Sequence, residues 1–145
     1  MEKVLILSGS KSDEEIAKQV MDVLAAFGVP CRYEVASAHR NPDKVDRLVK
    51  ESTASVFIAI AGLSAALPGV VASKTTKPVI GVPVNAALNG LDALLAVSQM
   101  PPNVPVACVG IGMGKNAGLL AVQILALTDS SIATKLAEFK EKLKQ

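Results

Sequence analysis

The sequence predicts an α/β fold, because short apolar runs alternate along the chain with segments whose apolar residues recur at helical spacing. Such alternation is typical of βαβ units, which build a parallel sheet covered by helices on both faces. The runs are rich in β-branched residues and look apolar throughout, as expected for strands buried on both faces. We therefore expect a three-layer sandwich with a flavodoxin-like parallel sheet of about five strands and an additional C-terminal helix.

The individual elements follow from these patterns. Strands are expected at Val4–Ser8, Cys31–Val35, Val56–Ile60, Val79–Val82 and Val106–Val109. Helices are expected at Asp13–Phe27, Asp43–Lys50, Leu63–Ser73, Leu91–Ser98 and Asn116–Leu127. Gly28 and Pro30 end the first helix, since glycine and proline commonly follow a helix C-terminus. The charged amphipathic segment 129–145 is predicted to be a final helix and is a candidate for packing on a neighbouring subunit.

The composition indicates a single domain spanning residues 1–145, which is long enough to bury a substantial core. Half of the residues are hydrophobic, and the mean hydropathy is +0.42. No apolar run reaches the ~18–20 residues that span a bilayer, and the N-terminus lacks the features of a signal peptide. We therefore expect a cytoplasmic protein that does not bind membranes, and we assign the apolar surplus to the interface of a homo-oligomer.

Charge and residue usage argue against two other kinds of partner. The net charge is +2 and aromatic residues make up 3% of the chain, without a basic stripe, which argues against nucleic-acid binding by phosphate neutralisation and base stacking. Cys31 and Cys108 lie far apart within predicted strands. They form no metal-binding spacing, and we interpret them as buried thiols.

Ligands of such folds bind outside the carboxyl ends of the strands, which directs attention to SGSKSD, ASAHRNP, AGLSAALPG, GVPVNAALNG and GIGMGKNAG. In the first stretch Gly9 permits a tight turn, and Ser10 and Ser12 offer hydroxyls. The helix that follows directs free N–H groups toward this turn, which predicts an anion site, with phosphate as the leading candidate. Asp13 opposes that sign, so it either accepts from sugar hydroxyls or, together with Ser12, only caps the helix.

The stretch ASAHRNP contains the only histidine, His39, directly after the second predicted strand. A lone histidine is structural more often than catalytic. Its neighbour Arg40, however, carries forked donors that suit phosphate or carboxylate. Imidazole is also the side chain whose ordinary pKa lies near neutrality, so His39 is the candidate for any proton transfer at this site.

The next two stretches are rich in small residues. In AGLSAALPG, Gly62 and Pro68 allow the backbone to approach a flat ligand, and Ser64 is the only polar side chain. Tight packing of a helix on the sheet is the alternative interpretation. The stretch GVPVNAALNGLDALLAVSQMP is long for a connection between strand and helix, and its Pro83, Asn85, Asn89 and Gly90 indicate a shaped binding loop.

The last stretch fits a dinucleotide-binding fingerprint, with the spacing Gly112-x-Gly114-x-x-Ala117 between a strand and a helix. That fingerprint also requires a following strand with an acidic residue about twenty positions on. Only a terminal helix remains in this chain, so we reject NAD binding. A turn that holds part of a ligand, or plain packing of glycine against glycine, remains.

Taken together and in chain order, these stretches resemble the PurE family of de novo purine biosynthesis. The matching segments are Gly9–Asp13, Ser37–Pro42, Leu67–Gly69, Gly81–Val84, Leu88–Asp92, Gln99–Pro101 and Lys115–Ala117. Each motif is weak by itself, whereas all of them in order, from about residue 4 to about residue 127, are highly specific.

The resemblance implies an α/β enzyme that usually assembles as an octamer and needs neither a metal nor an organic cofactor. The implied reaction converts N(5)-carboxyaminoimidazole ribonucleotide into 4-carboxy-5-aminoimidazole ribonucleotide, with CO2 held in the site between the two. His39 is implied as the acid/base group. The implied substrate-binding residues are Gly9, Ser10, Ser12, Asp13, Ser37, Ala38, Arg40, Gly62, Leu63, Ser64, Ala65 and Leu67.

One position departs from the family pattern. The mutase branch normally has a second histidine where this chain has Ala66. A sister branch, which carboxylates aminoimidazole ribonucleotide directly with CO2, also lacks that histidine and has a serine where Ser64 lies. The chain nevertheless keeps Arg40, Pro42 and the Val-Pro-Val loop of the mutase branch. We therefore favour the mutase. The alternatives are direct carboxylation and a weakened family member that only binds the ribonucleotide.

Residue content argues against two other uses of the same fold. A signalling receiver needs a phospho-acceptor aspartate at the end of the third strand, where this chain has Ala61 and Gly62. A flavodoxin needs aromatic side chains around its flavin, and this chain has one Tyr, three Phe and no Trp.

Overall fold

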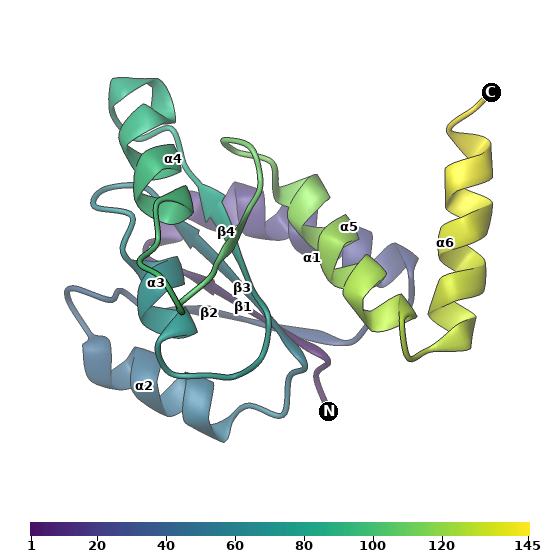
Figure 1. Cartoon of the computed structure of the whole chain (residues 1–145), viewed down its shortest axis with the longest axis horizontal. Helices are drawn as coiled ribbons and strands as arrows, with labels where there is room; N and C mark the ends of the chain where they lie inside the picture. The colour runs from purple at the N-terminus through teal and green to yellow at the C-terminus, as the bar shows by residue number, and fades with distance from the viewer.

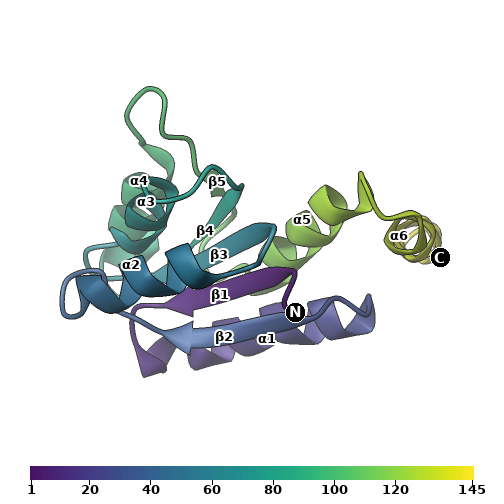
Figure 2. The ribbon, with the colours of Figure 1, turned by 90° about the horizontal axis from the view of Figure 1, so that it is seen from below.

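The computed structural model describes all 145 residues and contains one parallel sheet with helices on both faces (Figures 1 and 2). The strands are β1 (Val4–Ser8), β2 (Cys31–Val35), β3 (Val56–Ala61), β4 (Val79–Pro83) and β5 (Ala107–Cys108). Their order in the sheet is β2-β1-β3-β4-β5, which is the flavodoxin-like order. The predicted fold class is confirmed, and each predicted strand agrees with the observed one to within one residue at either end.

Six α-helices complete the fold. They are α1 (Glu14–Ala26), α2 (Pro42–Glu51), α3 (Leu67–Ala72), α4 (Leu91–Ser98), α5 (Gly114–Ala126) and α6 (Ser130–Lys142). A 3₁₀ turn, Lys11–Asp13, leads into α1. The chain leaves α1 through Gly28, whose left-handed conformation (φ 70°) favours glycine, as the sequence predicted for the end of this helix.

The helix predicted over Leu63–Ser73 is wrong in its first turn. The structure begins α3 at Leu67, and residues 62–66 form an irregular turn. Pro68 lies in the first turn of α3, where its missing N–H leaves no helical hydrogen bond unmade. A helical turn before Pro68 would clash with its ring, and Leu63 is 68% exposed rather than part of the apolar face.

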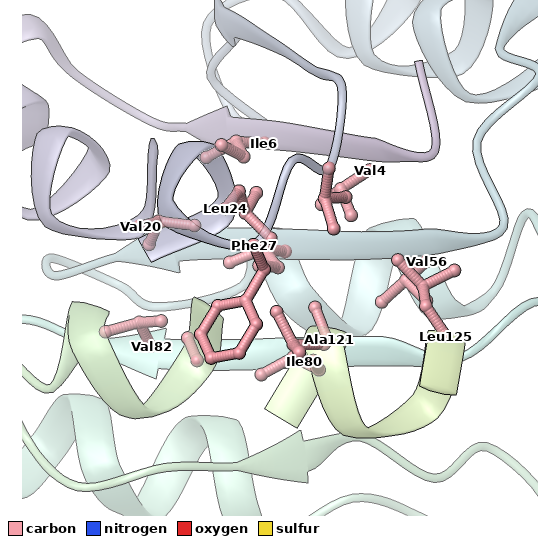
Figure 3. Packing of buried hydrophobic residues seen from close by; sticks show 14 of the residues in the cluster. Val4, Ile6, Val20, Leu24, Phe27, Val56, Ile80, Val82, Ala121 and Leu125 are labelled. Atoms are coloured by element: carbon pink, nitrogen blue, oxygen red, sulfur yellow. The ribbon is translucent and has the colours of Figure 1, made fainter. Parts of the chain in front are cut away.

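Two apolar layers hold the helices to the sheet. On one face, Val4 and Ile6 of β1 pack with Leu24 of α1 and with residues of α5 (Figure 3). On the other face, Leu5 and Leu7 pack against α2, α3 and α4. Successive side chains of a strand point to opposite faces, so β1 contributes to both layers.

Strand β2 does not fit the prediction that the strands are apolar throughout. It lies at the edge of the sheet and pairs only with β1. It carries Arg32 and Glu34, whose side chains form an ion pair at 2.8 Å. Cys31 and Cys108 lie on the two edge strands and are only partly buried, so the buried-thiol interpretation overstated their burial. Burial is nevertheless sufficient to raise the pKa of both thiols.

Two glycines of GIGMGKNAG, Gly114 and Gly118, serve packing between α1 and α5. A Cβ built on Gly114 would lie 2.6 Å from the carbonyl oxygen of Ile16, and one built on Gly118 would lie 2.9 Å from Cβ of Val23. A side chain at either position would force the helices apart. Of the two interpretations left open by the sequence, glycine packing therefore holds, although the contacts are with α1 rather than between glycines.

Helix α6 stands at one end of the molecule, beyond α5 (Figures 1 and 2). The ring of Phe139 meets that of Phe27 edge-on, with 5.6 Å between the centroids. Asp129, the N-cap of α6, pairs with Lys3 at 2.8 Å. The hydrogen bond from Lys3 and those from the backbone N–H groups of α6 lower the pKa of Asp129 to about 2. None of the helices combines the length and the apolar character needed to cross a bilayer.

Candidate active site

A cavity of about 410 Å³ opens at the carboxyl ends of the strands. In Figure 2 the arrowheads of β1 and β2 point away from α6, so this cavity and α6 lie at opposite ends of the sheet. Its lining residues are Gly9, Ser10, Ser12, Asp13, Ser37, Ala38, His39, Arg40, Ala61, Gly62, Leu63, Ser64, Leu67 and Ala86. The structure thus brings together every site residue predicted from the sequence except Ala65, which is buried at 3% exposure and does not line the cavity.

The turn after β1 presents two hydroxyls and a carboxylate. Ser10 Oγ accepts from the Ser12 N–H at 3.3 Å and from the Ser12 hydroxyl at 3.0 Å, so Ser10 caps the 3₁₀ turn. Asp13 is only 8% exposed and occupies the N-cap of α1, yet its side chain makes no capping hydrogen bond. Burial raises the pKa of this carboxyl. The capping interpretation therefore fails for Asp13, whose carboxylate makes no capping hydrogen bond.

The turn after β2 directs His39 and Arg40 away from the core. Ser37 Oγ accepts from the Arg40 N–H at 3.1 Å, and the Ser37 carbonyl accepts from the Asn41 N–H at 2.9 Å. Asn41 in turn caps α2 by accepting from the Lys44 N–H at 3.1 Å. Both His39 and Arg40 are exposed at the cavity.

Arg40 also joins two of the turns. Its Nη2 donates to the carbonyl oxygen of Gly9 at 2.7 Å, a charge-assisted contact between the turn after β2 and the turn after β1. The guanidinium is thereby held beside the hydroxyls of Ser10 and Ser12, all on the same cavity. This grouping places a fixed positive charge next to neutral donors.

The turn after β3 forms the apolar side of the cavity. Gly62 packs so closely on the segment after β4 that a Cβ there would lie 3.0 Å from Cβ of Ala86. Ala66, where the family pattern has a second histidine, is the N-cap of α3 and does not line the cavity. The imidazole of His39 is consequently the only one at this site.

Two lining residues, Ala61 and Ala86, were missed by the sequence analysis. Ala61 ends β3, and Ala86 is the sole residue of GVPVNAALNG that lines the cavity. The later part of that stretch turns through left-handed conformations at Leu88, Asn89 and Gly90, with φ values of 49°, 56° and 81°. The length of this loop and its proline, asparagine and glycine residues were the indications that it reaches the site, because the methyl group of Ala86 carries no chemical signature.

The polar groups at the cavity are hydroxyls, one carboxylate, one imidazole and one guanidinium. No three His, Cys, Asp or Glu side chains of the chain lie close enough together to hold a metal ion. Hydroxyls with a guanidinium suit an anionic group, a carboxylate suits sugar hydroxyls, and an imidazole suits proton transfer. The site is therefore equipped for a phosphorylated sugar carrying a group that gains or loses a proton.

Comparison with known proteins identifies the family. A family model described as AIR carboxylase matches residues 3–145. The chain is 59% identical over 142 residues to N5-carboxyaminoimidazole ribonucleotide mutase of Methanocaldococcus jannaschii, covering 98% of this chain and 90% of that protein. It is 47% identical over 149 residues to the mutase of the same name from Thermotoga maritima, covering 100% of this chain and 87% of that protein.

A solved structure supports the same assignment. The crystal structure of Treponema denticola PurE superposes with a TM-score of 0.86 at 31% identity, covering 98% of this chain and 91% of that chain. The resemblance inferred from the motifs is therefore confirmed, and the chain belongs to the AIR carboxylase family.

Proposed function

We propose that this chain is an N(5)-carboxyaminoimidazole ribonucleotide mutase of purine biosynthesis. The observation that carries this conclusion is the 59% and 47% identity, over nearly the whole chain, to proteins of that name. The residues that match the family's motifs also gather at one cavity. Direct carboxylation of aminoimidazole ribonucleotide is not favoured, because these relatives are named mutases.

The ribonucleotide is assigned to the cavity at the carboxyl ends of the strands. Its volume of about 410 Å³ falls in the range of roughly 300–1,000 Å³ that small-molecule sites occupy. The hydroxyls of Ser10 and Ser12, close to the N-terminus of α1, suit the phosphate. The free carboxylate of Asp13 suits the ribose hydroxyls, and Arg40 neutralises phosphate or carboxylate.

The proposed chemistry needs one group that moves protons. The carbamate N–C bond breaks, its electron pair stays on nitrogen, and that nitrogen takes up a proton. Carbon C4 of the electron-rich ring then attacks the released CO2 and is left with one proton too many. His39 donates the first proton as general acid and removes the second as general base, so protons balance over the isomerisation.

The cavity wall supports retention of CO2. Gly62, Leu67 and Ala86 contribute backbone and apolar groups to the lining. A wall of this kind keeps water away from the released CO2 and holds it beside the ring. Because the chain has a single histidine, one imidazole performs both proton transfers.

Self-association is part of the proposal, with the octamer as the form that the resemblance implies. Leu91 and Leu95 are 54% and 49% exposed, and their spacing of four residues places them on one side of α4. Leu88, in the turn before α4, is 74% exposed. A run of exposed leucines of this kind is typical of a contact between copies of a chain. Helix α6, at the end of the molecule, remains a candidate for a further contact.

The reaction is tested by offering purified protein two substrates separately. One reaction contains N(5)-carboxyaminoimidazole ribonucleotide, and the other contains aminoimidazole ribonucleotide with bicarbonate. We expect 4-carboxy-5-aminoimidazole ribonucleotide from the first reaction. Product from the second alone would identify the carboxylase, and product from neither would leave only a binding protein.

His39→Asn tests the proton role. We expect turnover to fall by a factor of about 100 or more, because the variant lacks the acid/base group. Binding of the ribonucleotide, followed by calorimetry, should remain measurable, and the exposed position makes a folding defect unexpected. Rates close to those of the wild type would remove His39 from the mechanism.

A further inference from the structure

We propose that Ser8 and Tyr33 form a positioning pair that fixes the turn Gly9–Asp13 for the anionic end of the ribonucleotide. Neither residue lines the cavity; both lie directly behind the turn that does. The inference rests on the proposed function, because it concerns the same substrate. It adds two positioning residues to that site.

Ser8 is a buried hydroxyl at the end of an apolar strand. It is 0% exposed and follows Val4, Leu5, Ile6 and Leu7 in β1. Burial of a hydroxyl is unfavourable unless it is hydrogen-bonded. Ser8 Oγ donates to the carbonyl oxygen of Ser10 at 3.0 Å and lies 2.8 Å from the phenol oxygen of Tyr33.

The direction of the hydrogen bond between Ser8 and Tyr33 follows from that of the bond between Ser8 and Ser10. A serine hydroxyl has one proton, and Ser8 gives it to the Ser10 carbonyl. Tyr33 is therefore the donor to Ser8 Oγ. Tyr33 pairs with Ile6 in the register of β2 and β1, so Ser8 lies two residues further along, within the diagonal reach of an aromatic side chain. The two bonds form a chain from the phenol through Ser8 to the backbone of the turn.

The hydrogen bonds from Tyr33 and Ser8 end at the carbonyl oxygen of Ser10, in the turn that carries the hydroxyls of the site. The Ser10 carbonyl also accepts from the Asp13 N–H at 3.2 Å, so it is held from the sheet by Ser8 and from the start of α1 by Asp13. Ser10 and Ser12 are linked to each other through their hydroxyls. Without Ser8, the Ser10 carbonyl keeps only the bond from the Asp13 N–H, while Gly9 stays held by Ile60 and Arg40. The peptide of Ser10 gains freedom, and a ligand would then have to order it on binding.

Tyr33→Phe and Ser8→Ala test the pair in steady-state kinetics with N(5)-carboxyaminoimidazole ribonucleotide. We expect KM to rise roughly three- to tenfold in each variant, as loss of a neutral hydrogen bond predicts. The value of kcat should stay within about twofold, since the pair orients a binding turn and touches no reacting atom. The double variant should match Ser8→Ala, because the Tyr33 hydroxyl acts on the turn only through Ser8 and its loss adds nothing once the Ser8 hydroxyl is gone.

Ser52→Ala is the matched control. Its hydroxyl donates to the Glu2 carboxylate at 3.0 Å and accepts from the Ala54 N–H at 3.1 Å, at the amino ends of the strands. This variant should alter thermal stability without changing KM. Should Ser8→Ala fail to fold, Tyr33→Phe keeps the ring and decides the question.

The outcomes separate the pair from the proposed function. An unchanged KM in Tyr33→Phe, or a fall in kcat that only tracks the amount of folded protein, would overturn the positioning role. A wild-type chain that neither converts nor binds the ribonucleotide would overturn the proposed function, and the inference with it.

Discussion

Asp13 is the only charged residue among those that are buried, and its surroundings give the sign of a pH effect on stability. Burial raises the pKa of this carboxyl, so the folded chain holds its proton more tightly than the unfolded chain does. The free energy of unfolding that this group contributes is therefore highest at acid pH. It falls as pH rises from the ordinary carboxyl pKa through the raised value in the folded state.

Asp13→Asn should accordingly raise the Tm at pH 7, because it removes a buried charge that has no partner in the chain. The gain should disappear below a pH of about 4, where the wild-type carboxyl is also protonated. Thermal melts across this range measure the effect, with the exposed Asp22→Asn as control. The same variant should bind the ribonucleotide about tenfold or more less tightly. A Tm difference independent of pH would contradict the assignment.

Arg40→Ala should weaken ribonucleotide binding by more than ~1.5 kcal/mol, as loss of a charge-assisted contact predicts. It also removes the bond to the Gly9 carbonyl that joins two turns of the site. Calorimetry measures the change, and Arg47→Ala, an exposed arginine of α2 that does not line the cavity, is the control. Equal affinities for the Arg40 variant and the wild type would exclude this guanidinium from the site.

The cavity residues with ionisable side chains could be predicted from the sequence. His39 and Arg40 could be identified because imidazole and guanidinium have distinct uses and follow a predicted strand. Ala61 and Ala86 could not, since a methyl group fits a core and a cavity wall equally well. Ala65 was expected at the site from the family resemblance, but the irregular turn at 62–66 leaves it buried.

Among the elements, helix boundaries were predictable where caps or glycines mark them. Gly28 marks the end of α1, and Asn41 with Pro42 marks the start of α2. The N-cap of α3, Ala66, makes no capping hydrogen bond, and only Pro68 in the first turn marks its start. Apolar spacing extended the prediction too far. The polar residues of β2 reflect its place at the edge, which follows from strand order rather than from local sequence.

Gly118→Ala tests the close packing of α5 on α1. Alanine is the better helix former by about 1 kcal/mol, so helix propensity alone predicts a more stable protein. The new Cβ would lie 2.9 Å from Cβ of Val23, which no side-chain rotation can move. We therefore expect a net destabilisation of about 1–3 kcal/mol. Denaturant unfolding measures it, with the exposed Gln123→Ala of α5 as control, and a stabilised variant would refute the contact.

For the whole molecule, the proposed self-association is predicted by the sequence of a single chain only in outline. The apolar surplus indicated an interface, but the exposed leucines became visible only once the fold had placed α4. The order of the sheet, in contrast, follows from alternating strands and helices, because such connections admit few arrangements.

The combined change Leu91→Lys and Leu95→Lys should lower the mass of the assembly in solution without unfolding the chain, since both side chains are about half exposed in one copy. Light scattering at micromolar concentration measures the mass. Leu127→Lys, at a leucine that is 84% exposed beyond α5, is the matched control and should leave the assembly unchanged. A monomeric wild type would contradict the proposed interface.

The two borders of the sheet decide how copies of the chain can meet. On one side β5 is only two residues long, and on the other β2 displays the charged pair Arg32 and Glu34. A short border and a charged border both discourage the addition of a foreign strand. We therefore expect any contact between copies of this chain to form through helices, and we expect little tendency of this sheet to grow into fibrils.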